Sequence, residues 1–483
     1  MSCASKPLRR ADPFGLGRWL LALSLLAGWG VAHAVVPEPV RAALARAQID
    51  ADSLSLWVAP VGTDTPRLAH QADRLAHPAS VMKLVTSAVA LQRLGPTWQW
   101  NTGVYFDGPV QRGVLEGSLI LQGRGDPRLV TERLWLLLQR VRQLGVQEIR
   151  GDILLDRSHF ALPPGDPGAF DGEPYRPYNV LPDALMLNQK SFTLSFRPDA
   201  ARGVAWVSAE PLLTGVELPA SVPLDRHPCG EWRAALAADF SQARRLKLGG
   251  SYPTACGEKT WPIAYQDPGS YDARLIDAAW RGVGGRLRGT VREGRVPAGL
   301  APAFEFASPS LAEVLRDMNK FSNNMVAQHT LLALSPVLPA RFEPARAAAL
   351  ETLQQGPGCA PGEIVLDNGS GRSREERITV HCLARVMQWS WAQPWMPELL
   401  ASLPVAGLDG TARRAVAASG RAHFKTGSLA NVAALAGWIH LPNGRRVVLV
   451  AFINHPLAAQ REARAALDAV VQWVLDDKEL NAP

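Results

Sequence analysis

Three short polar strings constrain this chain more than any other feature of its sequence. They are Ser80-Val-Met-Lys83, Ser322-Asn-Asn324 and Lys425-Thr-Gly427. They supply a serine with an amine one helical turn away, a second hydroxyl with an amide, and a cation followed by a glycine, which together suit acyl transfer by an activated serine. The fold must then gather segments that lie more than two hundred residues apart.

The first string opens a helix that is too apolar to lie on a surface. Pro78 is typical of a helix start, and the apolar residues after Ser80 predict a buried helix over residues 80–94. Lys83 then shares a face with Ser80. Because burial disfavours the ammonium form, we expect a lowered pKa for Lys83 and a neutral amine that takes the serine proton. Taken alone, the string also fits a serine helix cap followed by a lysine that reaches the surface.

The second string separates two helical patterns, which predict helices over residues 310–318 and 324–334. A polar turn between two buried helices projects Ser322 and Asn324 into a cavity. Ser and Asn also favour helix caps and turns, so this string by itself is more typical of a helix cap.

The third string precedes a predicted β-hairpin. Residues 432–441 and 446–453 have strand patterns, and an Asn-Gly pair between them supplies the turn. We therefore expect Lys425 on a strand beside this hairpin. Gly427 lets a ligand approach the backbone, so the strand suits the docking of an extended peptide. A lysine that protects a sheet edge is the structural alternative.

The three strings in this order resemble the serine acyltransferases that include penicillin-binding proteins and serine β-lactamases. Four more strings resemble those of the class C low-molecular-mass penicillin-binding proteins, the D-alanyl-D-alanine carboxypeptidase/endopeptidase family. They are Gly125-Asp-Pro127, Asp156-Arg-Ser-His-Phe160, Asp367-Asn-Gly-Ser-Gly371 followed by Ser373, and Leu403-Pro-Val-Ala-Gly-Leu-Asp-Gly-Thr411. The resemblance extends over nearly the whole chain after residue 34.

The resemblance implies a catalytic role for five residues. Ser80 would attack the carbonyl of the penultimate D-Ala after Lys83 takes its proton, and an acyl-enzyme would form. Ser322 would pass a proton toward the leaving nitrogen. Asn324 would hold the amide of the peptide, and Lys425 would favour binding of its carboxylate.

The resemblance also implies the substrate-binding groups and the partners. Thr426 would bond to the carboxylate on the strand that continues through Gly427 and Ser428. The backbone N–H groups of Ser80 and Ser428 would form the oxyanion hole. The substrates would be peptidoglycan peptides, and β-lactam antibiotics would be covalent inhibitors.

The distance between the first two strings predicts an insertion. Residues 98–302 are mostly β, with one clear helix over 131–144, and we expect two small subdomains there. Residues 35–97 and 303–483 are richer in helix and would form one catalytic domain, an antiparallel sheet packed with helices. The fold class is therefore α+β. The insert has strand-like runs at 102–106, 115–122, 148–155 and 191–196. The flanks have helical patterns at 40–49, 80–94, 310–318, 324–334, 345–355, 380–391 and 460–476.

Residues 1–34 have the pattern of a secretory signal peptide. Basic residues precede an apolar run, and Ala32-His33-Ala34 has the form of a cleavage site. We expect a periplasmic or secreted protein without a transmembrane anchor after cleavage. Removal of this segment takes four Lys/Arg and one Asp and lowers the formal charge from +7 to +4. This excess, spread without basic blocks, argues against nucleic acid and is compatible with an anionic cell wall.

Four cysteines follow residue 34, an even number for an oxidising compartment. Three pairings are open, and the local pairs Cys229–Cys256 and Cys359–Cys382 are the simplest. The spacing does not suit zinc and no His-Glu-x-x-His string is present, so we predict no metal and no cofactor. The remaining polar candidates are Asp126, Asp156 and Asp367, to which we assign structural roles, and His77 and His423, which we expect to be hydrogen-bonded within the protein or exposed to solvent.

Two other functions remain open. A serine β-lactamase shares the three strings but must deacylate fast, and the long β insert favours the peptidase. A noncatalytic cell-wall-binding scaffold has no need of a buried lysine beside a serine. The sequence leaves open the balance between carboxypeptidase and endopeptidase activity, the stem-peptide chemistry, the partners of the insert and the oligomeric state.

Overall fold

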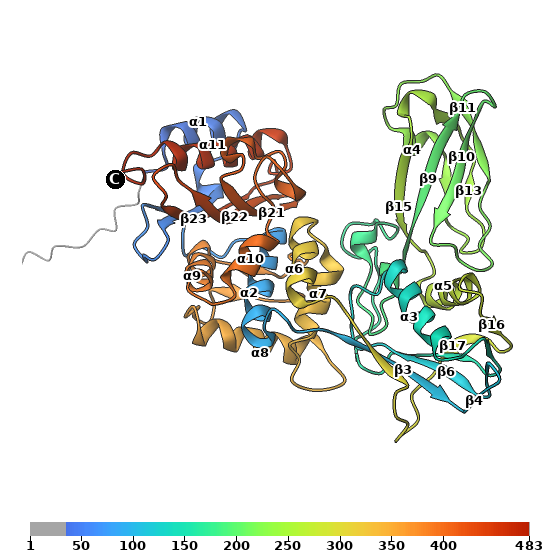
Figure 1. Ribbon diagram of the computed structural model, residues 1–483. Coiled ribbons are helices and arrows are strands. Elements are labelled where there is room, and N and C mark those ends of the chain that lie inside the picture. Colours follow the sequence, from blue (N-terminus) through green and yellow to red (C-terminus); the bar gives the residue numbers. More distant parts are fainter. Residues whose placement is uncertain (1–34, 483) are drawn as a thin grey trace, which may run out of the picture.

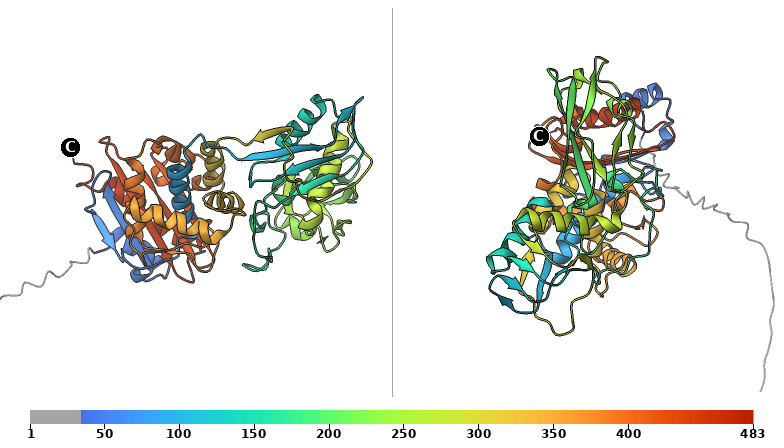
Figure 2. Two further views of the ribbon diagram at one scale, coloured as in Figure 1. Left: turned by 90° about the horizontal axis from the view of Figure 1, so that it is seen from below. Right: turned by 90° about the vertical axis from the view of Figure 1, so that its right-hand side faces the viewer.

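The computed structural model describes residues 35–482. The predicted signal peptide, residues 1–34, lies outside the described residues. The described chain forms two bodies side by side (Figures 1 and 2). The first contains both ends of the described chain. The second lies between β3 (Asn101–Asp107) and β18 (Phe304–Ala307), and these two strands pair with each other, so the chain enters and leaves this body at one place.

The first body is built on a five-stranded antiparallel sheet in the order β2-β1-β23-β22-β21. Strands from both ends of the chain therefore lie beside each other. The last two strands form the predicted hairpin, and Lys425 lies on the edge strand beside it, as predicted. The strands are β1 (Leu54–Pro60), β2 (Leu68–His70), β21 (Ala422–Leu429), β22 (Val432–His440) and β23 (Arg446–Asn454).

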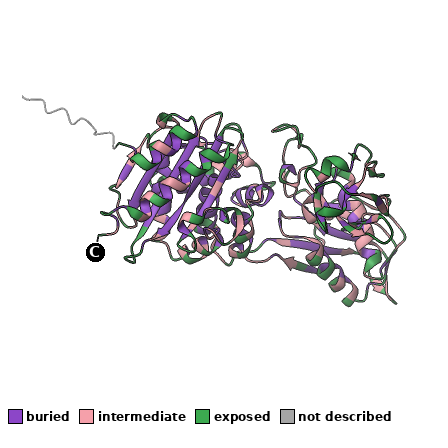
Figure 3. Cartoon of the chain, turned by 90° about the horizontal axis from the view of Figure 1, so that it is seen from above, coloured by how far each residue is buried: buried purple, intermediate pink, exposed green. Residues whose placement is uncertain are grey.

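Both faces of this sheet are buried. Successive side chains of a strand point to opposite sides, so each strand contributes to two apolar clusters. On β22, Val432 and Trp438 belong to one apolar cluster and Ala433 belongs to the other. Helices α1 (Glu38–Arg46) and α11 (Arg461–Asp476) cover the face of the second cluster. Figure 3 shows the mostly buried strands of this sheet beside the more exposed helices. The final helix packs on the sheet, as predicted from its apolar side.

The opposite face of the sheet packs against a helical layer with α2 (Met82–Leu94) at its centre. This helix contacts the five other helices of its layer and is buried along most of its length, as its apolar sequence predicts. A 3-10 turn, Ala79–Val81, precedes it. The other helices of this layer are α6 (Leu311–Lys320), α7 (Asn324–Leu332), α8 (Phe342–Gln355), α9 (Val380–Trp391) and α10 (Met396–Ser402). Only α10 was not predicted, because seven residues are too few to establish a helical period.

The second body contains sheets with the orders β17-β8-β6-β3-β18, β16-β7-β5-β4 and β14-β11-β10-β9-β15. The predicted strand-like runs form β3, β5 with β6, β7 with β8, and β9. The strands are β4 (Val110–Gln111), β5 (Val114–Leu115), β6 (Ser118–Gln122), β7 (Glu148–Ile149), β8 (Ile153–Asp156), β9 (Ser191–Asp199), β10 (Val204–Glu210), β11 (Ser221–Asp225), β12 (Ala238–Asp239), β13 (Lys247–Leu248), β14 (Tyr252–Pro253), β15 (Lys259–Ala264), β16 (Arg286–Leu287) and β17 (Val291–Glu293).

The expectation of one clear helix in this body is wrong. Besides α3 (Thr131–Gln143) and the short α4 (Trp232–Ala235), it contains α5 (Pro268–Gly282), which buries Leu275 and Trp280. Gly and Ser in the first turn of α5 disguise its start, although proline at the first position is a helix signal. The domain limits and the two subdomains stay predictions, and one apolar cluster joins strands of both larger sheets.

Two disulfides, Cys229–Cys256 and Cys359–Cys382, confirm the predicted local pairing. Cys229–Cys256 lies in the second body. Cys359–Cys382 lies in the helical layer of the first body. Within residues 35–482, no helix combines the length and apolarity that crossing a bilayer requires.

Candidate active site

Ser80 lies in the 3-10 turn that leads into α2, and Lys83 follows in the first turn of the helix. Lys83 Nζ donates a hydrogen bond to Ser80 Oγ at 2.9 Å. Ser80 is partly exposed, whereas Lys83 is fully buried. A hydroxyl that is open to solvent therefore contacts an amine that is shielded from water, as the sequence predicted.

Lys83 has two further acceptors inside the protein. Its Nζ donates to Asn324 Oδ1 at 2.8 Å and to the carbonyl oxygen of Ser370. Burial, followed by the charge of the neighbouring Lys425, holds the pKa of Lys83 well below its usual range. This favours the neutral amine, which is the form that accepts a proton from a serine hydroxyl.

Lys425 and Ser322 form a second pair of an amine and a hydroxyl. Lys425 Nζ donates to Ser322 Oγ at 3.0 Å and to Thr426 O at 2.7 Å. Burial lowers the pKa of Lys425 to about 7. Lys425 is therefore not an exposed cation: its amine is fully buried and is bonded to the second serine of the site.

β21 lies close to the turn that carries Ser80, and this closeness explains why position 427 is a glycine. A Cβ at this position would lie 2.6 Å from Pro78 O and 3.2 Å from Ser80 N, so only glycine fits without a shift. Two residues beside the reacting groups have left-handed backbones, Ala79 at φ +47° and Ser322 at φ +57°. Such conformations cost about 1–3 kcal/mol for residues other than glycine and persist where the surrounding structure enforces them.

Two cavities meet at this point. Ser80, Ser322 and Ser428 line both of them. The first cavity, about 580 Å³, extends along Thr426, whose hydroxyl donates to that of Thr411 at 2.7 Å. The second, about 780 Å³, includes Asn324 and side chains of the second body. A substrate that passes Ser80 therefore has space on both sides of the bond to be cleaved.

These features agree with the comparisons with known proteins. The model of the D-Ala-D-Ala carboxypeptidase 3 (S13) family matches residues 37–474. The chain belongs to this family. The D-alanyl-D-alanine carboxypeptidase of Actinomadura sp. (strain R39) is 30% identical over 414 residues, which cover 79% of this chain and 75% of the relative. The D-alanyl-D-alanine carboxypeptidase DacB of Haemophilus influenzae is 25% identical over 82% of this chain and 84% of its own.

Solved structures support the fold of this S13 family member. Penicillin binding protein 4 of Haemophilus influenzae superposes with a TM-score of 0.71 at 23% identity, covering 88% of this chain and 96% of that structure. A predatory peptidoglycan endopeptidase of Bdellovibrio bacteriovorus gives a TM-score of 0.51 at 15% identity, covering 87% of this chain and 92% of its own. The α+β architecture predicted from the sequence is confirmed.

Sequence reasoning missed a buried carboxylate behind the S13 site. Glu376 accepts hydrogen bonds from the backbone N–H groups of Gly369 and Gly371, at 2.6 and 2.7 Å, and a longer one from Asp367. These bonds shape the loop whose Ser370 carbonyl contacts Lys83. Burial raises the pKa of Glu376 to about 7. In the sequence this residue lies in a run of charged residues that resembles an ordinary surface.

Sequence reasoning also missed a loop of the second body that reaches the cleft. Tyr178 O accepts a hydrogen bond from Asn324 Nδ2 at 3.1 Å. Asp171 forms an ion pair of 2.8 Å with Arg372, whose guanidinium lies 4.2 Å from the ring centroid of Phe170. These residues line the second cavity. The loop has few regular elements and no recognisable motif, so this contact could not be predicted from local patterns.

Four of the five remaining polar candidates form hydrogen bonds within the protein. The three carboxylates accept hydrogen bonds from backbone or arginine groups, and His423 is partly buried beside His440. His77 Nε2 donates to Ser373 O at 2.7 Å, and its Nδ1 accepts from Ala79 N at 2.9 Å. His77 therefore supports the turn before Ser80. The three carboxylates are Asp126, Asp156 and Asp367.

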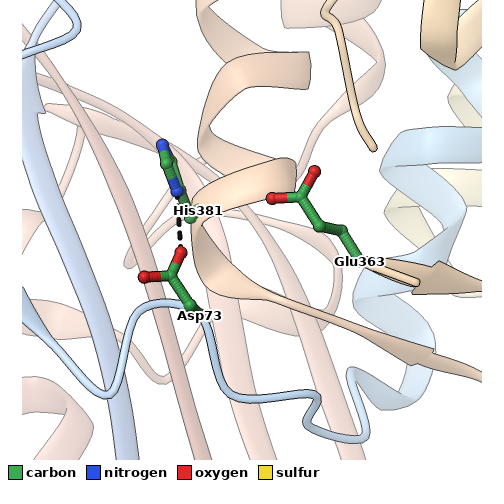
Figure 4. A group of neighbouring side chains, drawn as sticks. All are labelled: Asp73, Glu363 and His381. Carbon is green, nitrogen blue, oxygen red and sulfur yellow. Dashed lines mark hydrogen bonds and ion pairs between the residues drawn. The ribbon is translucent and has the colours of Figure 1, made fainter. Parts of the chain in front are cut away.

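One group of metal-ligand type occurs among the described residues. The ligand atoms of Asp73, Glu363 and His381 lie within 4.8 Å of one another (Figure 4). The Nδ1 atom of His381 and the carboxylate of Asp73 are 2.9 Å apart, and Glu363 forms an ion pair with Arg385. Internal bonds thus account for this group, and the expectation of no metal stays a prediction.

Proposed function

We propose that this protein is a serine-type D-alanyl-D-alanine carboxypeptidase and endopeptidase that acts on the stem peptides of peptidoglycan. The observation that carries the proposal is the 2.9 Å hydrogen bond from Lys83 Nζ to Ser80 Oγ, at the meeting point of two cavities. Two relatives bear the name D-alanyl-D-alanine carboxypeptidase, which supports the substrate class.

The first half of the reaction forms an acyl-enzyme. The neutral amine of Lys83 takes the proton of Ser80 Oγ as the oxygen bonds to the carbonyl carbon of the penultimate D-Ala. The negative charge on the carbonyl oxygen is stabilised by the backbone N–H groups of Ser80 and Ser428, a contribution whose loss costs about 3 kcal/mol in related sites. The bond between carbon and nitrogen then breaks, and the proton held by Lys83 passes through Ser322 to the leaving nitrogen, so the Lys83 amine is neutral again.

The second half releases the acyl group. Water adds to the ester carbonyl and gives up a proton to the Lys83 amine, and Ser80 Oγ leaves and takes that proton back. When the leaving group is a terminal D-Ala, the enzyme acts as a carboxypeptidase. When it is the amine of a cross-bridge, the same chemistry is that of an endopeptidase.

The polar groups around Ser80 hold the substrate in our proposal. The carboxylate next to the scissile bond is bound by the Thr426 hydroxyl and attracted by Lys425 in its charged form. Asn324 holds an amide of the acyl strand in the second cavity, and Gly427 allows that strand to lie against β21. β-Lactams would acylate Ser80 in the same way. A penicillin-acylated form of the Bdellovibrio endopeptidase supports this analogy.

We also propose a location outside the cytoplasm, in the periplasm or secreted, because peptidoglycan peptides are found there and two disulfides suit an oxidising compartment. The catalytic domain would comprise residues 35–97 and 303–483, with residues 98–302 as the insert.

Mass spectrometry of muropeptides tests this function. The protein is incubated with a linear pentapeptide that ends in D-Ala-D-Ala and with a cross-linked dimer, alongside Ser80→Ala. We expect loss of one alanine from the first and cleavage of the second, neither of them with Ser80→Ala. Products that persist in Ser80→Ala would contradict the proposal.

Labelling with penicillin separates this function from its two alternatives. A peptidase gives a long-lived adduct on Ser80. Rapid release of hydrolysed penicillin would instead indicate a β-lactamase, and the absence of an adduct would indicate a scaffold.

A further inference from the structure

The first cavity is much larger than the single D-alanine that leaves in a carboxypeptidase reaction. Thr426, the proposed binding residue for the carboxylate next to the scissile bond, lines this cavity. The cavity would therefore hold the leaving group. Its volume of about 580 Å³ is in the range of about 300–1,000 Å³ typical of pockets for drug-sized ligands. A single D-alanine fills only a small part of this space.

The walls of this cavity carry unneutralised positive charge. Arg413 and Arg414 lie on one wall, in the segment that follows Thr411, and Arg464 lies on α11. All three side chains belong to exposed residues, and none forms an ion pair with a residue in the described part of the chain. Among the described lining residues, Asp468 is the one acidic group. Burial raises its pKa, which disfavours its charged form.

Arginines arranged in this way suit carboxylates. A guanidinium presents a planar fork of donors that matches the two oxygens of a carboxylate, and it stays charged at every physiological pH. Three of them around one cavity raise the local concentration of an anionic ligand. The site therefore favours a leaving group that extends beyond the carboxylate at Thr426 and carries further carboxylates.

We propose that this cavity binds the second peptide strand of a cross-linked substrate, and that Arg413, Arg414 and Arg464 select for endopeptidase cleavage. In a cross-linked peptide the leaving amine belongs to a side chain of a second stem peptide, which brings its own backbone and free carboxylates. This inference rests on the proposed function, because it takes Ser80 as nucleophile and Thr426 as the carboxylate-binding residue of the leaving group.

Two soluble substrates test the inference. One is a linear peptide that ends in D-Ala-D-Ala, and the other is a synthetic cross-linked dimer with the same acyl strand. For the double variant Arg413→Glu/Arg464→Glu, we expect the ratio of kcat/KM for the dimer to kcat/KM for the linear peptide to fall about tenfold. Amidation of the carboxylates on the second strand of the dimer should lower the same ratio for the unmodified protein. Added salt should lower it too.

Arg461→Glu is the matched control. Arg461 lies on the same helix, three residues before Arg464, and is exposed but does not line the cavity. The same change of charge there should leave the ratio as it is. An unchanged ratio in the double variant, or an equal loss on both substrates, would overturn the inference.

Binding to whole sacculi tests a different anionic ligand for the three arginines, which is an anionic polymer of the cell wall. If the double variant loses sacculus binding while its substrate ratio is unchanged, the arginines serve attachment, and the inference is wrong. Failure of the proposed function gives a different result, since the unmodified protein would then cleave neither substrate.

Discussion

The two sides of the cleft are built in different ways. On the side of the first body, the amines of Lys83 and Lys425 come from a buried helix and an edge strand, and both are fully enclosed and bonded. On the side of the second body, a loop reaches the cleft with side chains that remain partly in solvent, such as Asp171. Burial shifts the pKa values of the amines on one side, and exposed polar groups line the cavity on the other.

This difference teaches where each kind of change is tolerated. A buried amine depends on every acceptor around it, because an unmade hydrogen bond in a low-dielectric interior is costly. An exposed charge pair at the rim contributes about 0–1 kcal/mol. We therefore expect substitutions in the first body to affect the chemical step and substitutions in the loop to affect substrate preference.

Removal of the nucleophile tests the first body most directly. Ser80→Ala should lower peptide turnover by about 10⁴-fold or more, because the acyl-enzyme no longer forms. The absence of a penicillin adduct in the mass spectrum checks this result. Thermal unfolding close to that of the unmodified protein would show that the loss is chemical, and an adduct on another residue would contradict the assignment.

Removal of the Glu376 carboxylate tests whether this residue positions the Ser370 loop that bonds to Lys83. In Glu376→Gln a single amide oxygen replaces the two oxygens that accept backbone N–H groups, so the Ser370 loop shifts. We expect about 10²-fold slower acylation and a stability loss of about 1–3 kcal/mol. Because the charge of Glu376 raises the pKa of Lys83, the acid limb of the pH profile should move to lower pH.

Glu375→Gln is the matched control for this change. Glu375 is the exposed neighbour of Glu376 and makes no contact with the Ser370 loop through its side chain. Stopped-flow acylation and calorimetry should give values close to those of the unmodified protein. An equal effect of both substitutions would show that Glu376 acts only through overall charge.

The pH dependence tests the two buried amines. In the proposed mechanism Lys83 acts as a base when neutral, so kcat/KM should rise with pH on the acid side. Lys425 attracts a carboxylate only when charged, so kcat/KM should fall above its pKa of about 7. The expected loss is about tenfold per pH unit on that limb.

A substrate with an amidated terminus separates the two limbs. Its profile should keep the acid limb and lose the alkaline one. An alkaline limb of equal size for both substrates would mean that Lys425 acts through Ser322 and not through the carboxylate.

The smallest effect is expected on the loop. Asp171→Asn breaks the ion pair with Arg372 at the rim, and we expect a change in KM for peptides of about two- to fivefold with little change in kcat. Steady-state kinetics on a linear peptide checks this. Asp166→Asn, an exposed change in the same loop outside the cavity, should leave KM unaltered. A large fall in kcat for Asp171→Asn would mean that the two sides of the cleft are not distinct.

Much of the first body was predictable from local patterns. The apolar run after Ser80 fixed a buried helix, and the Asn-Gly turn fixed the hairpin beside Lys425. Glu376 was not predictable, because a carboxylate that binds backbone N–H groups follows no spacing rule. The α5 helix was missed for a local reason, since turn-forming residues occupy its first turn.

The sequence by itself determined the residue types of the site, the order of the strings and the distance between them, because these depend only on composition and chain spacing. It favoured the local disulfide pairs among three possible pairings, and the structure decided between them. Only the tertiary structure decided that Lys425 is buried, that Glu376 supports the Ser370 loop, and that Phe170 and Asp171 reach the cleft. The reason is physical: pKa and cavity shape depend on which distant groups exclude water from a site, and that arrangement exists only after the chain has packed.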